Sequence, residues 1–379
     1  MRCIRLVKPP RVLTPPRLRW SAVALLCATA LSMCAADGGV EEWRVARRVA
    51  EWRDINALAG FRTPHAWERD PAACNHSRPF GAAAAYAAGC ANGHRYSALP
   101  PPWEVTTVAL CAQLAANGVR NISLLGDSFM RHLHVALATQ LKDDFAAGAL
   151  EAKHDPSCEH RGQYSEKQCR HEIKTSHVVC GGAVELWFSA RTHSPHAGIW
   201  DVPREEELGA FDVVLWSYGM HPVDWTHVPP STGPENAMNF VRAGGKCRGW
   251  SAEFRRKVVW LSMHAGLHTA REQGAWRVNR NTHAWRRAFA EKMERGLRAE
   301  CGVEGFVDLL EPTIKAVLQV PRIAELTHDG QHWGPEINLA KLLLLWPYLL
   351  AAAQRGKTRH SKLSQRASSS LPTNCSGST

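Results

Sequence analysis

From position 107 onward, apolar residues follow two spacings, one typical of buried strands and one typical of helices. Short apolar runs bounded by turn residues predict strands at 121–126, 183–190, 211–216, 257–263 and 303–309. Periodic or strongly apolar segments predict helices at 107–118, 128–141, 282–299 and 336–353. Strands separated by helices or long crossovers favour an α/β fold. We therefore expect a three-layer sandwich with a central, mostly parallel, five-stranded sheet.

The flanking segments lack a sustained period. Residues 37–105 combine a polar, helix-prone stem with a lead-in rich in Pro, Gly, Ala and Cys, which predicts disulfide-tied loops that wrap the main domain. The main domain then spans 106–353, with a polar insertion at 144–180. The basic, Ser-rich segment 354–379 is predicted to be disordered. The helix before it is not read as a membrane span, because Lys341 and Pro347 interrupt it.

The N-terminus predicts membrane targeting. Six basic and no acidic residues in 1–20 precede an apolar run at 21–36, which indicates a cytosolic basic tail and an uncleaved signal anchor. Ala35 and Ala36 leave a cleaved signal peptide, and hence a secreted protein, as the alternative. We expect a single-pass type II protein whose domain faces the lumen of the secretory pathway.

The positive charge of the chain is confined to its ends. The formal net charge is +11, with 46 basic and 35 acidic residues. Six basic residues lie in 1–20 and five in 354–379, which leaves 35 basic against 35 acidic residues between them. The folded part is neutral, so we expect no nucleic-acid partner.

The 12 cysteines agree with a lumenal domain. They contain no C-x-x-C pair, which argues against a zinc ribbon or a thioredoxin motif. In an oxidising compartment they are expected to form disulfides, whose connectivity the spacing does not determine. Asn75 is the expected N-glycosylation acceptor, because the sequon at Asn121 opens a buried strand.

Two motifs carry candidate chemistry. The first strand ends at Gly126-Asp127-Ser128, which places a serine at the N-terminus of a helix, a position that suits a nucleophile or an ordinary helix cap. Near the other end of the domain lies Asp329-Gly330-Gln331-His332-Trp333. A carboxylate three residues before a histidine can orient the imidazole while the other ring nitrogen faces a serine. The alternative interpretation is that this second motif forms only a polar turn before the last helix.

The paired motifs resemble those of the SGNH (GDSL-type) hydrolase superfamily. The similarity is closest to its PC-esterase branch, which includes trichome-birefringence-like polysaccharide O-acetyltransferases and the lumenal domain of sialic acid O-acetyltransferase. Arg131, three residues after the serine, and Trp333, directly after the histidine, are marks of this branch. The resemblance covers roughly residues 100–350 and implies an SGNH-like fold.

The resemblance implies a role for each matching residue. Ser128 would be the nucleophile, His332 the base and Asp329 the carboxylate that orients it. The oxyanion hole would use the amide of Ser128 and Gly219. Where many relatives have Asn, this chain has Ser217, so the remaining donor is either that hydroxyl or His221.

Further residues are expected near the substrate. Tyr218, His221, Trp225 and Trp333 could contact a sugar, and Arg131 could hold the acyl group or an acidic glycan. His264 could approach the site from the end of a strand. We read His264 and His268 as loop residues rather than zinc ligands, because H-A-G-L-H lacks the Glu of H-E-x-x-H.

Together with these patterns, the resemblance implies a Golgi-type serine enzyme that transfers or removes an acyl group, with acetyl as the leading case, on a glycan or polysaccharide. No resident cofactor is expected, although a transferase would need an acyl donor such as acetyl-CoA or an acetylated carrier. The alternatives are a non-catalytic glycan-binding or scaffold protein that keeps the fold, which Ser217 would favour, and a zinc hydrolase built on the His-rich loops.

Overall fold

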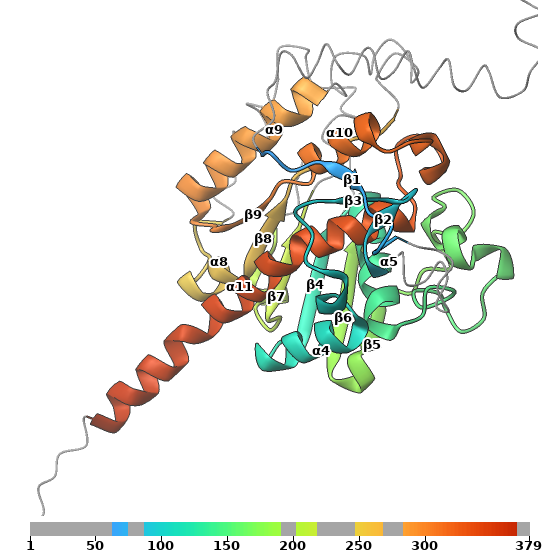
Figure 1. Cartoon of the computed structure of the whole chain (residues 1–379). Coiled ribbons are helices and arrows are strands. Elements are labelled where there is room, and N and C mark those ends of the chain that lie inside the picture. Colours follow the sequence, from blue (N-terminus) through green and yellow to red (C-terminus); the bar gives the residue numbers. More distant parts are fainter. Residues whose placement is uncertain (1–62, 75–86, 191–201, 218–246, 268–282, 370–379) are drawn as a thin grey trace, which may run out of the picture. The chain divides into compact units, whose positions relative to one another are not determined.

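The computed structural model describes residues 63–74, 87–190, 202–217, 247–267 and 283–369 (Figure 1). The predicted basic tail at 1–20, the predicted anchor at 21–36 and most of the stem lie outside the described residues. So do the sequons at Asn75 and Asn374.

A mixed but mostly parallel sheet forms the centre of the described domain. Its strands are, in spatial order, β5 (Ser176–Val179), β6 (Val184–Ala190), β4 (Asn121–Gly126), β7 (Val213–Trp216), β8 (Val258–Leu261) and β9 (Gly305–Val307). All neighbours run parallel except β5 and β6. Leu125 of β4 pairs with Trp216 of β7, and Gly126 pairs with Ala190 of β6. The carboxyl ends of these three strands therefore lie at one edge of the sheet.

Helices cover the two faces of this sheet. They are α4 (Thr107–Ala116), α5 (Ser128–Lys142), α6 (Glu205–Leu208), α8 (Ala252–Lys257), α9 (His283–Gly296), α10 (Leu310–Gln319) and α11 (Pro335–Ser369). Ile122 and Leu124 of β4 belong to the apolar cluster that contains α5 and α11, whereas Leu125 belongs to the cluster on α8 and α9. Burial on both faces explains why the central strands read as continuous apolar runs.

The predicted α/β class and the five parallel strands agree with the structure, but the predicted strand number is wrong. A sixth strand, β5, lies inside the segment read as a polar insertion and pairs antiparallel with β6. Its buried side chains are only His177 and Val179, so its alternation is too short to stand out from the surrounding loops. The helices α6, α8 and α10 were not predicted from the sequence either.

The lead-in contains a small sheet rather than loops alone. Three short antiparallel strands, β1 (Trp67–Arg69), β2 (Cys90–Ala91) and β3 (His94–Tyr96), pair in the order β1-β3-β2. Trp67 is buried, and its indole N–H donates a hydrogen bond of 2.9 Å to the carbonyl of Pro312 in α10. The lead-in therefore packs on the main domain, although strands of two or three residues gave no periodic signal.

The last helix is longer than predicted. It continues through Ser369, so the expectation of a disordered tail from residue 354 is wrong over this range, and residues 370–379 lie outside the described part. By length and composition alone, Pro335–Gly356 could cross a membrane, yet 72% of its apolar window is buried within the fold. Such burial is typical of the core helix of a globular domain.

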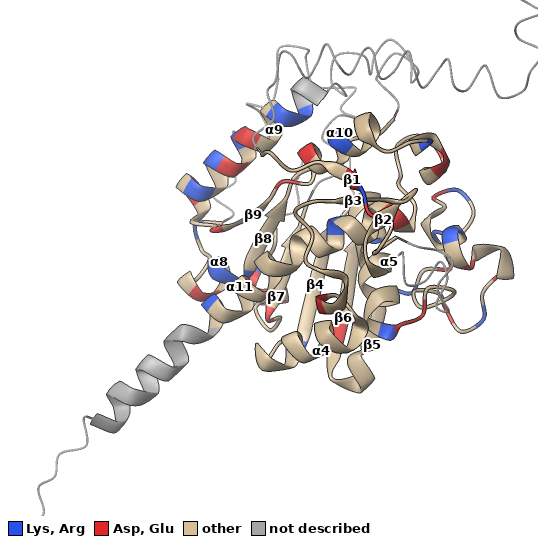
Figure 2. Cartoon of the chain, in the orientation of Figure 1, with Lys and Arg blue, Asp and Glu red and all other residues tan. Residues whose placement is uncertain are grey.

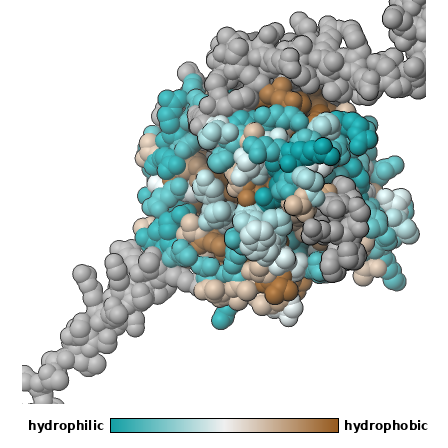
Figure 3. Space-filling model, viewed as in Figure 1, coloured by the Kyte–Doolittle hydropathy of each residue, from teal (hydrophilic) through white to brown (hydrophobic). Residues whose placement is uncertain are grey.

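Charge and hydropathy are distributed as in a globular domain with a solvated surface. Lys, Arg, Asp and Glu lie mainly on helices and loops, with both signs along α9, while the strands of the central sheet are nearly uncharged (Figure 2). The face viewed in Figure 3 is largely hydrophilic with scattered apolar patches. Among the described residues, the large exposed apolar side chains are Trp103, Val108, Val178, Trp187 and Tyr348.

Four disulfides tie the described segments together. They join Cys74 to Cys90, Cys111 to Cys180, Cys158 to Cys169 and Cys247 to Cys301. Disulfides persist in oxidising compartments, so the bonds fit a secretory or lumenal environment. Cys111–Cys180 fastens α4 to the edge of the sheet, and Cys247–Cys301 fastens the segment before α8 to the end of α9.

Removing Cys111–Cys180 should destabilise the domain more than removing Cys158–Cys169. The first closes 69 residues and the second 11. Loop-closure entropy alone predicts a difference of about 1.6 kcal/mol in the free energy of unfolding. Urea unfolding of the two Cys→Ser double variants would measure it. Equal losses in the two variants would show that native-state contacts, rather than loop length, set the effect.

Candidate active site

The first motif forms a tight strand-to-helix corner. β4 ends at Gly126 and α5 begins at Ser128, with Asp127 between them as the N-cap. The buried carboxylate of Asp127 accepts a hydrogen bond of 3.0 Å from the amide of Phe129. Asp127 therefore provides the cap, which leaves the hydroxyl of Ser128 available for another partner.

Gly126 is required at this corner by space. A Cβ at this position would lie 2.4 Å from the carbonyl oxygen of Ser217 and 2.5 Å from Cγ of Met130. The first of these atoms is backbone and cannot move aside cheaply. The close approach of β4 and β7 at this point thus explains the glycine of the motif.

The second motif folds into a turn that is closed by its own carboxylate. Gly330 has a φ of 77°, a left-handed conformation that glycine adopts without strain. Oδ1 of Asp329 accepts hydrogen bonds from the amides of Gln331 (2.9 Å) and His332 (2.8 Å). Its other oxygen, Oδ2, lies 2.7 Å from Nδ1 of His332. One carboxylate therefore fixes both the backbone of the turn and the imidazole.

The two motifs meet in space. Nε2 of His332 lies 2.8 Å from Oγ of Ser128, although the two residues are 204 positions apart in the chain. Burial by itself would raise the pKa of Asp329, but its hydrogen bonds with His332 outweigh burial and hold that pKa well below its usual range. Asp329 is thus ionised at neutral pH. The Ser–His–Asp geometry expected from the sequence is present.

The predicted oxyanion-hole residues are placed only in part. Ser128 is the first residue of α5, where helix N–H groups lack intrahelical partners. Ser217 is buried at the end of β7, and its amide donates to the carbonyl of Leu125 over 3.1 Å. Gly219, together with Tyr218, His221 and Trp225, lies outside the described residues. The proposed oxyanion roles therefore stay predictions.

Two residues expected at the substrate do not face it. Trp333 is fully buried, and its indole N–H donates to the carbonyl of Ala265 over 2.6 Å. His264 is 1% exposed and has both ring nitrogens engaged, by the carbonyl of Gln331 and by Lys341. Buried side chains offer no surface to a substrate. Both assignments are corrected, and Trp333 and His264 belong to the support of the histidine loop.

Arg131 is near the site but already has an anionic partner. It forms an ion pair with Glu166, and both side chains are 15% exposed. Glu166 also lies 2.8 Å from Nε2 of His132, one helical turn after Ser128. This pairing neutralises the guanidinium and reduces its ability to hold an anionic group of the substrate.

The sequence analysis missed Glu166 and His132. The ring of His132 lies edge-on to that of His332, with ring centroids 5.1 Å apart. Complete burial lowers the pKa of His132 to about 4, so this ring is neutral at neutral pH. The i, i+4 spacing from Ser128 to His132 could have indicated that both lie on one face of α5. Glu166 lies in a loop and carried no comparable signal.

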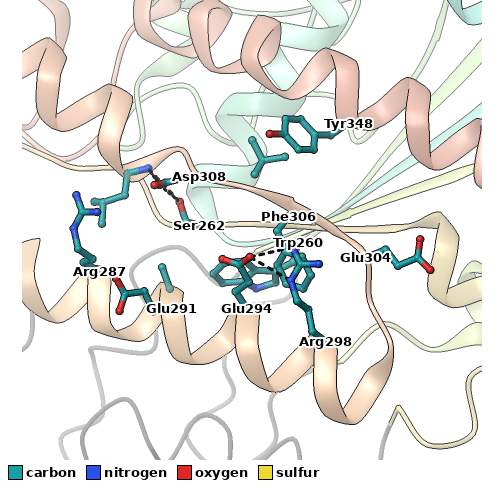
Figure 4. Close-up of a pocket in the computed structure, with 13 residues that line it drawn as sticks. Trp260, Ser262, Arg287, Glu291, Glu294, Arg298, Glu304, Phe306, Asp308 and Tyr348 are labelled. Carbon is teal, nitrogen blue, oxygen red and sulfur yellow. Dashed lines mark hydrogen bonds and ion pairs between the residues drawn. The ribbon is translucent and has the colours of Figure 1, made fainter. Parts of the chain in front are cut away.

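The described residues also line a pocket of about 300 Å³ between α9 and the edge strand β9 (Figure 4). The proposed catalytic residues do not line it. Glu294 of α9 and Arg298 of the π-helical turn that follows it (Leu297–Cys301) form an ion pair of 3.0 Å along its wall, and Arg298 lies 4.3 Å above the ring of Phe306. Asp308 accepts a hydrogen bond from Ser262. These polar groups already have partners within the pocket wall, so we assign the pocket no catalytic role.

Comparison with known proteins adds no relative. No protein-family model matches the chain, and no curated protein or solved structure matches it significantly. Within the described residues, no group of three or more His, Cys, Asp or Glu side chains is arranged to hold a metal. The function of the protein is therefore inferred from the geometry of the site and from the two motifs.

The Glu166 cluster should give the domain an acid-dependent stability. Burial alone would raise the pKa of Glu166, but His132 and Arg131 outweigh it and lower the pKa from 4.5 to about 2. A lowered carboxyl pKa stabilises the fold above about pH 4.5, and the contribution is lost as the pH falls toward 2. Urea midpoints between pH 3 and pH 7 should therefore depend less on pH in Glu166→Gln.

Glu304→Gln is the matched control for this experiment. Glu304 is 57% exposed and pairs with Arg355 at 3.5 Å. Its removal should preserve the wild-type pH dependence. If Glu166→Gln also preserves it, the ion pair with Arg131 does not carry the predicted linkage.

Proposed function

We propose that the protein is a serine-dependent acyltransferase or esterase that works through an acyl-serine intermediate. The observation that carries this proposal is the chain of two hydrogen-bonding contacts, 2.8 Å from Ser128 to His332 and 2.7 Å from His332 to Asp329. The carboxylate of Asp329 accepts a hydrogen bond from Nδ1–H, which leaves Nε2 unprotonated and able to take the proton of the serine hydroxyl. That tautomer is the one a serine nucleophile requires.

The reaction follows from this arrangement. Oγ of Ser128 attacks the ester carbonyl carbon as its proton passes to Nε2 of His332, and a tetrahedral oxyanion forms. The oxyanion collapses, the ester C–O bond breaks, and His332 returns the proton to the leaving oxygen. Water or a sugar hydroxyl then attacks the acyl-serine, with His332 again taking and returning a proton. Ser128 is regenerated with its proton.

A glycan O-acyl group, most plausibly O-acetyl, is the proposed substrate. This choice rests on the motif-level resemblance of Gly126-Asp127-Ser128 with Arg131, and of Asp329 through Trp333, to the PC-esterase branch of SGNH hydrolases. The four disulfides agree with a compartment where glycans are modified. A membrane anchor and a Golgi location are part of the proposal. Transferase and esterase share these residues and differ in how the acyl-serine is shielded from water.

The alternative is a glycan-binding or scaffold protein that has kept the fold. Ser217 favours it, because this short side chain stands where the resemblance leads us to expect an oxyanion-hole Asn. The assembled hydrogen bonds of Ser128, His332 and Asp329 favour catalysis. Reactivity of Ser128 separates the two functions.

A serine-directed fluorophosphonate should label the purified lumenal domain at Ser128. His332 activates the hydroxyl, and the probe captures an activated serine without knowledge of the substrate. Mass spectrometry of the labelled peptide would identify the site, and Ser128→Ala should not react. A wild-type protein with intact disulfides that fails to label would support the scaffold function.

Replacement of Asp329 by Asn should slow labelling by a factor on the order of 10⁴, because an amide can stabilise the tautomer whose Nε2 carries the proton and cannot accept one from Ser128. Asp155→Asn is the control, since Asp155 caps the 3₁₀ turn Pro156–Cys158 and its change should leave the rate unaltered. Rates of the two variants are compared by stopped-time labelling. Similar rates would argue that Asp329 only closes its turn.

A further inference from the structure

A buried chain of polar side chains connects α11 with the histidine loop. It starts at Lys341, which is 2% exposed and lies in the apolar interior of the helix layer. Its Nζ donates to Oδ1 of Asn338 over 2.6 Å and lies 2.9 Å from Nδ1 of His264. A lysine this deeply buried requires partners, and both of these are on the side facing the catalytic turn.

The two partners of His264 agree on one tautomer of its ring. The carbonyl oxygen of Gln331 can only accept a hydrogen bond, so Nε2, which lies 2.9 Å from it, carries the proton and donates. In the neutral ring Nδ1 is then an acceptor, and Nζ of Lys341 is its donor over 2.9 Å. Burial and the charge of Lys341 hold the pKa of His264 well below its usual range, which keeps the ring neutral.

Gln331 is held a second time by Arg286 of α9. The fully buried guanidinium donates to the carbonyl of His264 over 2.6 Å and to Oε1 of Gln331 over 3.2 Å. The two loops also pack without spare room, since a Cβ at Gly266 would lie 2.6 Å from Oε1 of Gln331. The backbone of Gln331, the residue before His332, is therefore held by His264 in the loop that follows β8, and its side chain by Arg286 of α9.

The same network reaches the serine corner. The ring of His264 stacks on that of Phe129, with centroids 3.5 Å apart, and Phe129 directly follows Ser128. Burial lowers the pKa of Lys341 to about 7, and the carboxylate of buried Asp127, the residue before Ser128, opposes this shift. One network thus contacts the chain neighbours of both proposed catalytic residues, which come from opposite ends of the domain.

We propose that Lys341 is a positioning residue that, through His264 and Gln331, fixes the imidazole of His332 against the hydroxyl of Ser128. Its effect on the reaction rests on the proposed function, whereas its effect on the geometry of the site does not. Lys341 touches neither substrate nor reacting atoms. It supplies the donor without which buried Nδ1 of His264 would lack its hydrogen bond, and it thereby holds the ring in place against Gln331.

The test replaces Lys341 by Met in the lumenal domain and measures the rate of fluorophosphonate labelling at Ser128. We expect a loss of 10- to 100-fold, on the order of what a misplacement of about 1 Å costs. Lys341→Gln keeps one neutral donor for His264 and should recover part of the rate. It also provides a measurement if Lys341→Met does not fold.

Lys315→Met is the matched control. Lys315 is also buried, at 3% exposure, but it lies on α10 and donates to the carbonyls of Thr63 (2.7 Å) and His65 (2.6 Å) in the lead-in. Its loss removes an equally buried lysine, which also lies 2.9 Å from Oε1 of Glu311, without touching the histidine loop. We expect both Met variants to melt earlier than wild type, and only Lys341→Met to label slowly. A folded Lys341→Met protein that labels at the wild-type rate would overturn the proposal.

A second readout does not require activity. The Nδ1 proton between His332 and Asp329 should give a far-downfield NMR resonance in protein isotope-labelled at histidine. It should shift or broaden in Lys341→Met and stay unchanged in Lys315→Met. If wild type fails to label but this pattern is seen, the proposed function fails and the positioning role stands. An unchanged resonance in Lys341→Met would reject the positioning role by itself.

Discussion

The contact between Ser128 and His332 is the constraint on which the rest of the site depends. The serine begins the helix after the strand β4 and the histidine lies in a turn before the last helix, and 2.8 Å separates their reacting atoms. Hydrogen bonds of this length need placement to within a few tenths of an ångström. Much of the described core serves that placement, because neither motif can supply it alone.

Parallel pairing provides one half of the placement. β4 lies between β6 and β7 in register, so its carboxyl end is fixed on both sides, and Gly126 permits the close approach to Ser217. The corner is then rigid before any loop is added. Asp127 caps α5 and leaves the hydroxyl of the half-buried Ser128, the first residue of the helix, available to His332.

Buried polar contacts provide the other half. The histidine turn is closed internally by Asp329 and externally by the indole of Trp333 and the side chains of His264 and Arg286. Buried polar groups favour one arrangement strongly, since each alternative leaves a donor or acceptor unpaired. Trp333 and His264, which looked like substrate contacts in the sequence, have this supporting role instead.

The sequence by itself determined the α/β class, the five parallel strands, the Gly-Asp-Ser corner and the Asp–His pair, because these depend on local periodicity and on spacings of a few residues. Only the tertiary structure decided the cysteine pairing, the antiparallel strand β5, the burial of Trp333 and the partners of Lys341 and Glu166. Each of these joins segments far apart in the chain. Residue type tells which bonds a side chain can make, whereas the packing of distant elements decides which of them it does make.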